Sequence, residues 1–206
     1  MLNKLVGAGL ALESDAHLMV QVRAGDEASF DLLLQKYRGP IVGYLTRMVG
    51  SQAVAEELAQ EVFLRVYRAR GSYEPSAKFT TWLYRIASRV ALNAIRDHKA
   101  QSGDRSLDEP LIGVKLADGR PTREQELVAE VRLAFVRQAI AALPGNQRSA
   151  VLLHKYQELD YSQIAASLGC SVSAVKSLLF RAYGTLRSRL EAVSDHQHNR
   201  QTQVTR

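Results

Sequence analysis

Apolar side chains recur every three to four residues along most of this chain, and this helical spacing is the feature that most restricts its fold. They form one stripe between Asp26 and Met48, and a second stripe between Ser51 and Arg70 whose opposite face is charged. No segment alternates apolar and polar residues in the way a half-buried strand does. The sequence therefore predicts an all-α protein.

The helical pattern is interrupted once by a stretch of different composition. Residues 101–125 contain five Gly or Pro residues and no apolar period, which is typical of a linker. We predict two small helical domains, at 14–100 and 126–193, joined by this flexible linker and flanked by an N-terminal arm at 1–13 and a polar tail at 194–206. Domains of about 80 residues bury only roughly 60% of their unfolded surface, so each is expected to be modestly stable.

Charge and cysteine content restrict the partners and the compartment. The 206 residues include 27 Lys and Arg against 21 Asp and Glu, a net charge of +6 that favours a polyanionic partner. Cys170 is the only cysteine, so an internal disulfide and a cysteine-based zinc site are excluded. Residues 1–12 resemble the start of a signal peptide but have no cleavage site, and no apolar run reaches the ~18 residues of a membrane span. We expect a cytoplasmic protein.

The segment 161–186 has the spacing of a helix-turn-helix. Ala165 is small where two helices approach each other, and Gly169 follows four residues later, where the turn needs a positive φ. Ser171 is a candidate N-cap for the second helix. From Val172 to Leu190 that helix has four basic residues and no acidic one, so we expect it to enter the major groove of DNA and to contact phosphates. The alternative is an ordinary helical hairpin with a solvated basic face.

Aromatic side chains are concentrated between residues 73 and 84. Four of these twelve residues are aromatic, namely Tyr73, Phe79, Trp82 and Tyr84. Basic residues lie among them and just after them: Lys78, Arg85, Arg89, Arg96 and Lys99. Single-stranded nucleic acid binds to aromatic rings among cations, because stacking contributes ~1–3 kcal/mol per base. We predict that this window captures unstacked bases; the alternative is that the rings are mainly core.

Recognisable catalytic machinery is missing from the sequence. The five histidines form no HExxH motif and no cluster with carboxylates, and there is neither a Walker-type glycine-rich loop nor a GxSxG motif. We expect no enzymatic activity, no metal and no cofactor.

Three segments, taken in order, resemble one known family. They are AEELAQEVFLRVYRA at 55–69, AKFTTWLYRIASRVALNAIR at 77–96, and ALPGNQRSAVLLHKYQELDYSQIAASLGCSVSAVKSLLFRA at 142–182. The chain resembles the extracytoplasmic-function (ECF, group IV) sigma factors of bacterial RNA polymerase, in the sigma-70 superfamily, over about residues 14–192. The order of the motifs is more specific than either motif alone.

The resemblance implies a function, partners and site residues. Such a protein binds core RNA polymerase and promoter DNA, directs promoter-specific initiation, and is typically inhibited by an anti-sigma factor. The residues that match the β′ clamp-binding helix are Glu57, Leu58, Gln60, Glu61 and Phe63. The residues that match the segment by which such proteins recognise and melt the minus-ten promoter element are Tyr73, Lys78, Phe79, Trp82, Arg85, Arg89 and Asn93. The residues that match the minus-thirty-five contacts are Ser171, Ser173, Lys176, Ser177 and Arg181.

Several positions depart from the family pattern. Arg89 and Asn93 stand where Asn and Asp are common, so a minus-ten preference is not inherited. In the second helix of the helix-turn-helix, Arg, His and Arg are usual where this chain has Leu178, Phe180 and Tyr183. These replacements remove cations from the helix expected to bind minus-thirty-five DNA.

Two other kinds of protein remain as alternatives. A stand-alone helix-turn-helix regulator would bind duplex operator DNA without polymerase, at half-sites about one helical turn apart. The aromatic window argues against it, because a protein that reads duplex DNA has no use for stacking platforms. A helical adaptor that binds only proteins is disfavoured by the acid-free second helix.

Overall fold

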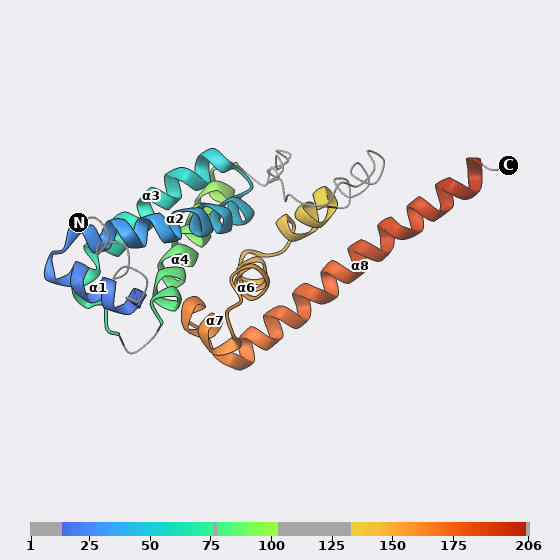
Figure 1. Ribbon diagram of the computed structural model, residues 1–206. Helices are drawn as coiled ribbons and strands as arrows, with labels where there is room; N and C mark the ends of the chain where they lie inside the picture. The colour runs from blue at the N-terminus through green and yellow to red at the C-terminus, as the bar shows by residue number, and fades with distance from the viewer. Residues whose placement is uncertain (1–13, 76–77, 103–132, 205–206) are drawn as a thin grey trace, which may run out of the picture.

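The computed structural model describes residues 14–75, 78–102 and 133–204, and every regular element in these ranges is a helix (Figure 1). The first half contains α1 (Asp15–Ala24), α2 (Glu27–Val49), α3 (Gln52–Arg68), the 3-10 helix η1 (Arg70–Ser72) and α4 (Phe79–Ser102). The second half contains a helical segment at 133–141, α6 (Gly145–Tyr156), α7 (Tyr161–Leu168) and α8 (Val172–Val204). The all-α prediction is confirmed.

Two of the predicted segments fall largely outside the described residues. These are the N-terminal arm at 1–13 and the linker at 101–125, of which only 101 and 102 are described, as the end of α4. At the other end of the chain, α8 does not stop near residue 193 as expected. It continues to Val204, through a polar stretch that has no Gly or Pro to end a helix.

Short polar residues cap the starts of α1, α2, α3 and α7. In each case the side chain accepts a hydrogen bond from a backbone N–H of the first turn, which otherwise has no partner in the helix. The residues that do so are Ser14, Asp26, Ser51 and Asp160. Asp160 forms a full capping box with Gln163. Hydrogen bonds from the Ser162 hydroxyl and the Gln163 N–H hold the pKa of the Asp160 carboxyl below its usual value.

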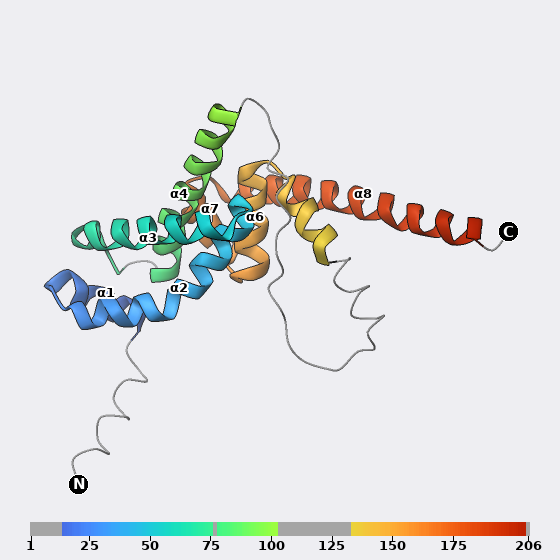
Figure 2. The ribbon, with the colours of Figure 1, turned by 90° about the horizontal axis from the view of Figure 1, so that it is seen from above.

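One hydrophobic core runs through both halves of the chain. Helices α2, α3 and α4 lie side by side, α6 packs against α2 and α4, and α7 packs against α4 (Figures 1 and 2). Buried side chains such as Leu45, Leu83 and Leu152 belong to the same cluster. In both views the C-terminal part of α8 projects away from the other helices, while its start packs against α6 and α7. The two predicted domains are therefore in direct contact.

Buried hydroxyl groups join the two halves. The Tyr44 hydroxyl lies 2.9 Å from Ser88 Oγ on α4 and 2.7 Å from Ser149 Oγ on α6. Burial raises the pKa of Tyr44, so its phenol stays protonated, while the bonds to the two serines act in the opposite direction. Nearby, Ser167 Oγ of α7 donates to the Thr81 carbonyl of α4 at 3.2 Å. Periodicity identifies each buried stripe but not the stripe that faces it, so this contact was not predicted.

Arg148 of α6 makes a second polar connection between the halves. Its guanidinium donates to the Met48 carbonyl near the end of α2, and to the carbonyls of Ala141 and Leu143. Carbonyls at a helix C-terminus carry partial negative charge and lack partners within the helix, so a cation is suited to them. Burial lowers the pKa of Arg148, but an arginine remains charged at any physiological pH.

We expect Arg148→Met to lower the free energy of unfolding by about 2–4 kcal/mol, because three carbonyls lose a charged donor. Thermal or urea unfolding measures the change. Arg189→Met is the control, since Arg189 is exposed on α8, and it should change stability by less than about 0.5 kcal/mol. Equal stability of the two variants would show that the Arg148 contacts contribute little.

A helix that spans a membrane must be long and predominantly apolar. Across the described ranges, no single helix is both long and apolar enough to cross a membrane. Two consecutive helical segments, Tyr161–Leu168 and Val172–Glu191, reach the length and apolar composition of a membrane span only when they are taken together. The chain bends by 99° between them.

Candidate functional site

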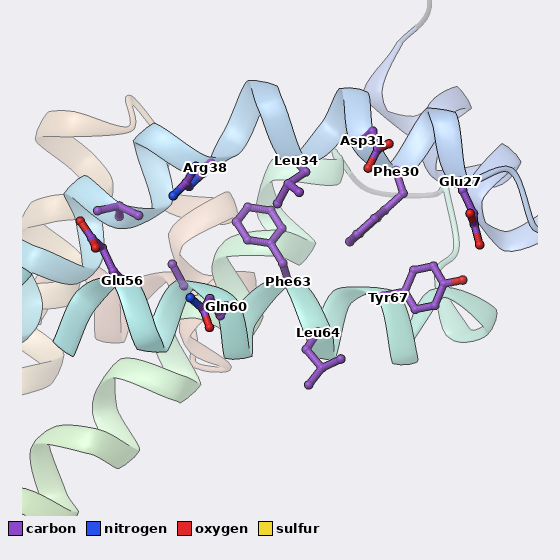
Figure 3. A pocket seen from close by; sticks show the side chains of 12 residues that line it. Glu27, Phe30, Asp31, Leu34, Arg38, Glu56, Gln60, Phe63, Leu64 and Tyr67 are labelled. Carbon is purple, nitrogen blue, oxygen red and sulfur yellow. The ribbon is translucent and has the colours of Figure 1, made fainter. Parts of the chain in front are cut away.

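A groove runs between α2 and α3 on the surface of the first half (Figure 3). It has a volume of about 630 Å³. Phe30 and Leu34 of α2 line it together with Phe63 and Tyr67 of α3, and the Phe30 and Tyr67 rings meet edge to face at 5.1 Å. The polar and charged lining residues are Glu27, Asp31, Arg38, Glu56 and Gln60. An apolar groove of this kind between two helices suits an amphipathic helix of a partner.

The structure divides the five predicted clamp-binding residues between different environments. Gln60 is exposed and lines the groove, whereas Phe63 lines it from a buried position. Glu57 is exposed, and Glu61 pairs with Arg65 one turn further on, at 2.6 Å. Leu58 is half-buried and packs against the core. Leu58 and Phe63 therefore also contribute to packing, whereas Glu57, Gln60 and Glu61 supply the polar surface of this part of α3.

Sequence reasoning missed the contribution of α2 to this groove. The apolar stripe predicted between Asp26 and Met48 includes Phe30 and Leu34, and their spacing is that of residues that face a core. Both are only half-buried, because α3 covers one side of them and leaves the other open to the groove. A stripe of apolar residues wider than one neighbouring helix can cover is the sequence signal that indicates such a groove.

The aromatic window contributes mainly to the core. Tyr73, Phe79 and Tyr84 are buried, Phe79 with only 2% of its surface exposed. Their rings contact other rings: Tyr37 and Phe79 are 5.3 Å apart, and Tyr44 and Tyr84 are 5.5 Å apart. The prediction that these rings form an open stacking platform is therefore wrong for Tyr73, Phe79 and Tyr84. Burial of such large apolar surfaces stabilises the fold, and the composition of a window does not tell which side of a helix a ring occupies.

The remaining predicted minus-ten residues form a basic face on α4. Trp82, Arg85, Arg89 and Asn93 follow one another at intervals of three or four residues, so they lie on one side of the helix. The last three are exposed, and Trp82 is half-buried, with its ring 5.2 Å from that of Tyr73. Lys78 is exposed immediately before the helix. We call these five residues the α4 basic face.

Helices α7 and α8 form the predicted helix-turn-helix. Gly169 has a φ of +66°, and the Cys170 N–H donates to the Ala165 carbonyl at 3.0 Å, which closes the turn. Ser171 caps α8, since its Oγ accepts from the Ala174 N–H at 3.1 Å. Burial raises the pKa of the Cys170 thiol, which packs against the core as a small apolar group.

All five predicted minus-thirty-five residues are exposed at the start of α8: Ser171, Ser173, Lys176, Ser177 and Arg181. The opposite side of the helix is buried through Val175, Leu179 and Ala182. The helix therefore presents a polar, basic surface to solvent while its apolar side holds it against α6 and α7. We call the exposed surface between Ser171 and Arg181 the α8 recognition face.

Comparison with known proteins gives the family. The chain matches Sigma-70 region 2 over residues 33–101 and Sigma-70, region 4 over residues 136–186. It is 34% identical over 181 residues to the RNA polymerase sigma-H factor of Pseudomonas aeruginosa, covering 84% of this chain and 92% of that protein. It is 32% identical to the ECF RNA polymerase sigma factor SigW of Bacillus subtilis, over 82% of this chain and 93% of that protein. The chain belongs to the ECF sigma factors.

As an ECF sigma factor it directs promoter-specific transcription initiation, and it binds core RNA polymerase and promoter DNA. The resemblance found in the sequence is confirmed, and the alternative of a stand-alone helix-turn-helix regulator is not favoured.

Solved structures share the fold of this ECF sigma factor. CnrH in complex with the cytosolic domain of CnrY matches with a TM-score of 0.65 and 22% identity, over 87% of this chain and 99% of that chain. The sigma factor RpoE in complex with the anti-sigma factor NepR, from Bartonella quintana, matches with a TM-score of 0.60 and 20% identity, over 79% and 96%. At these identities the likeness concerns the fold.

Proposed function

We propose that the α2/α3 groove and the adjacent surface of α3 bind a helix of the β′ clamp of core polymerase. The groove carries this proposal, because an apolar channel between two helices can accept the apolar face of a third. The charged residues around this apolar channel are mainly acidic: Glu27, Asp31 and Glu56 line it, with Arg38 as the single cation among the lining residues. Such a surface repels DNA and attracts a basic partner. Gln60 and the acidic residues Glu57 and Glu61 extend the contact along α3.

The α4 basic face contacts the minus-ten element. Lys78, Arg85 and Arg89 are exposed and positioned to neutralise phosphates, and Asn93 can donate to and accept from base edges. The Trp82 ring offers a stacking surface at the half-buried edge of the helix. Tyr73 and Phe79 support that ring from inside, at centroid distances of 5.2 and 6.1 Å.

The α8 recognition face binds the minus-thirty-five element in the major groove. Its first residues point outward at the start of a helix-turn-helix recognition helix, which is where such proteins contact base edges. Lys176 and Arg181 contribute the phosphate contacts nearest to the bases, and Arg187 and Arg189 continue the basic surface along α8.

Promoter binding requires the two halves to separate. Elements centred 35 and 10 base pairs upstream lie about 25 base pairs apart, or about 85 Å along the DNA at roughly 3.4 Å per base pair. In the packed structure Ser167 of α7 lies only 3.2 Å from Thr81 of α4. Ser173 follows Ser167 by six residue steps, which is at most about 22 Å of chain. The α8 recognition face and the α4 basic face therefore cannot reach both elements in this packed arrangement.

We propose that this sigma factor acts in the cytoplasm, without catalysis, metal or cofactor of its own. An anti-sigma factor is its proposed inhibitor, since two solved structures of the same fold carry an anti-sigma factor or the cytosolic domain of a partner protein.

Salt dependence tests the proposed phosphate contacts. We expect Lys176→Ala to lower the slope of log affinity against log salt by about one, because each neutralised phosphate contributes about 0.9. Binding of holoenzyme to an upstream promoter duplex at several salt concentrations gives the slope. Lys155→Ala is the control, because Lys155 is an exposed lysine on α6, and it should leave the slope unchanged. The same slope for wild type and Lys176→Ala would mean that Lys176 does not contact phosphate.

A further inference from the structure

Phe180 is the most exposed large apolar side chain among the described residues, with 82% of its surface open to solvent. Its neighbours Leu179 and Ala182 are buried, so Phe180 faces outward because of its position on α8 and not because the helix is loosely packed. Three other Phe side chains, Phe30, Phe63 and Phe79, lie in or against the core. A solvent-exposed Phe forgoes the stabilisation that burial would give it.

The three departures from the family pattern in α8 are not equivalent. Leu178 and Tyr183 are half-buried and pack against the core. The Tyr183 hydroxyl lies 3.0 Å from His154 Nδ1 of α6, so this residue joins two helices. Phe180 alone among the three faces solvent. Core packing explains the first two replacements, whereas Phe180 is not part of the core that the described residues form.

Phe180 lies in the middle of the surface proposed to bind DNA. Ser173, Lys176, Ser177 and Phe180 stand at positions i, i+3, i+4 and i+7, which places them on one helix face. Recognition helices that lie in the major groove use this same spacing for their base contacts. Gly184, one turn further on, adds no side chain to this face, and no heavy atom of the described residues lies within 4 Å of where its Cβ would be.

The charge around Phe180 favours duplex DNA as its partner. Between Val172 and Leu190 the helix has Lys176, Arg181, Arg187 and Arg189 and no acidic residue. Ser177 Oγ donates to the Ser173 carbonyl within the helix, at 3.0 Å, so this hydroxyl approaches DNA as an acceptor. The phenyl ring has neither donor nor acceptor. In the major groove the apolar group that distinguishes one base from the others is the thymine C5-methyl.

We propose that Phe180 selects thymine in the minus-thirty-five element by packing against its C5-methyl group. This inference rests on the proposed contact of the α8 recognition face with upstream DNA. It assigns to this chain a base preference that a His or Arg at the same position would not give, because those side chains donate hydrogen bonds and favour acceptor edges.

Deoxyuridine tests the proposal because it differs from thymidine only by the missing methyl group. Promoters are first selected from a randomised upstream duplex pool with holoenzyme, and each thymine of the selected element is then replaced singly by deoxyuridine. For wild type, one replacement should weaken binding by about threefold to tenfold. For Phe180→Ala, whose exposed site leaves the fold intact, the same replacement should change binding by less than about 1.5-fold, since the methyl has lost its partner. Phe180→Leu keeps an apolar side chain and should retain part of the discrimination.

The outcomes separate this inference from the proposed function. If the selected element contains no thymine, or if deoxyuridine affects wild type and Phe180→Ala alike, the role of Phe180 is overturned while upstream binding stands. If Phe180→Ala weakens binding to every duplex equally, Phe180 is a non-specific contact and the proposal also fails. If holoenzyme selects no upstream sequence at all, the assignment of the α8 recognition face itself is wrong.

Discussion

A disulfide between α4 and α6 is expected to abolish transcription initiation by this sigma factor. Ser88 and Ser149 are buried, and their Oγ atoms are 3.5 Å apart. A cysteine Sγ occupies the place of the serine Oγ, so the two thiols would lie close enough for a modest side-chain adjustment to bring the sulfurs to the roughly 2.0 Å of a disulfide bond. The variant is Ser88→Cys with Ser149→Cys, made in a Cys170→Ala background so that no other thiol reacts. Oxidation holds the α4 basic face beside α7, and run-off transcripts should disappear.

Reduction should restore transcription in the same sample, because it releases the halves. The two single-cysteine variants, oxidised in the same way, should remain active. Core polymerase should still bind the oxidised double variant, since the α2/α3 groove lies apart from the crosslink, and this shows that the protein is folded. Full activity of a sample whose disulfide is verified by mass spectrometry would show that the packed arrangement is compatible with initiation.

A lysine in the α2/α3 groove is expected to cost about 100-fold in affinity for core polymerase. Leu64 lines the groove with 42% of its surface exposed, and an ammonium group there meets the apolar face of the partner helix. Loss of such an interface anchor typically costs at least about 2 kcal/mol, and an unpaired charge adds to that cost. Equilibrium binding of wild type and of Leu64→Lys to core polymerase gives the two dissociation constants to compare.

Val54→Lys is the matched control for that variant. Val54 lies on the same helix and is 41% exposed, but it does not line the groove. It should lower core affinity by less than about twofold, and both variants should melt close to wild type because exposed substitutions change stability by about 0.5 kcal/mol or less. Equal losses in the two variants would place the clamp contact elsewhere on the surface.

Local features of this fold were predictable from sequence because they depend on neighbours along the chain. Helical spacing predicts the helices, Gly169 marks a turn that needs a positive φ, and Ser171 caps α8. Exposure of the α8 recognition face follows from the same periodicity.

Features that depend on residues far apart in sequence were not predictable. The Tyr44, Ser88 and Ser149 hydroxyls meet from three helices, and nothing in the local pattern of any one helix indicates the other two. The groove arises because α2 and α3 do not cover each other fully. The sequence shows how many aromatic rings lie between residues 73 and 84 but not whether each ring faces the core or solvent. Tyr73 and Phe79 were therefore wrongly expected to be exposed.

Run-off transcription with core polymerase that lacks a sigma factor tests the central claim most directly. The templates are fragments of the source genome, and the start of each transcript is mapped with and without the protein. For an ECF sigma factor we expect discrete starts that depend on the added protein and that share sequence elements about 10 and 35 base pairs upstream. No association with core polymerase and no new starts, together with tight binding to duplex sites by the protein alone, would contradict it.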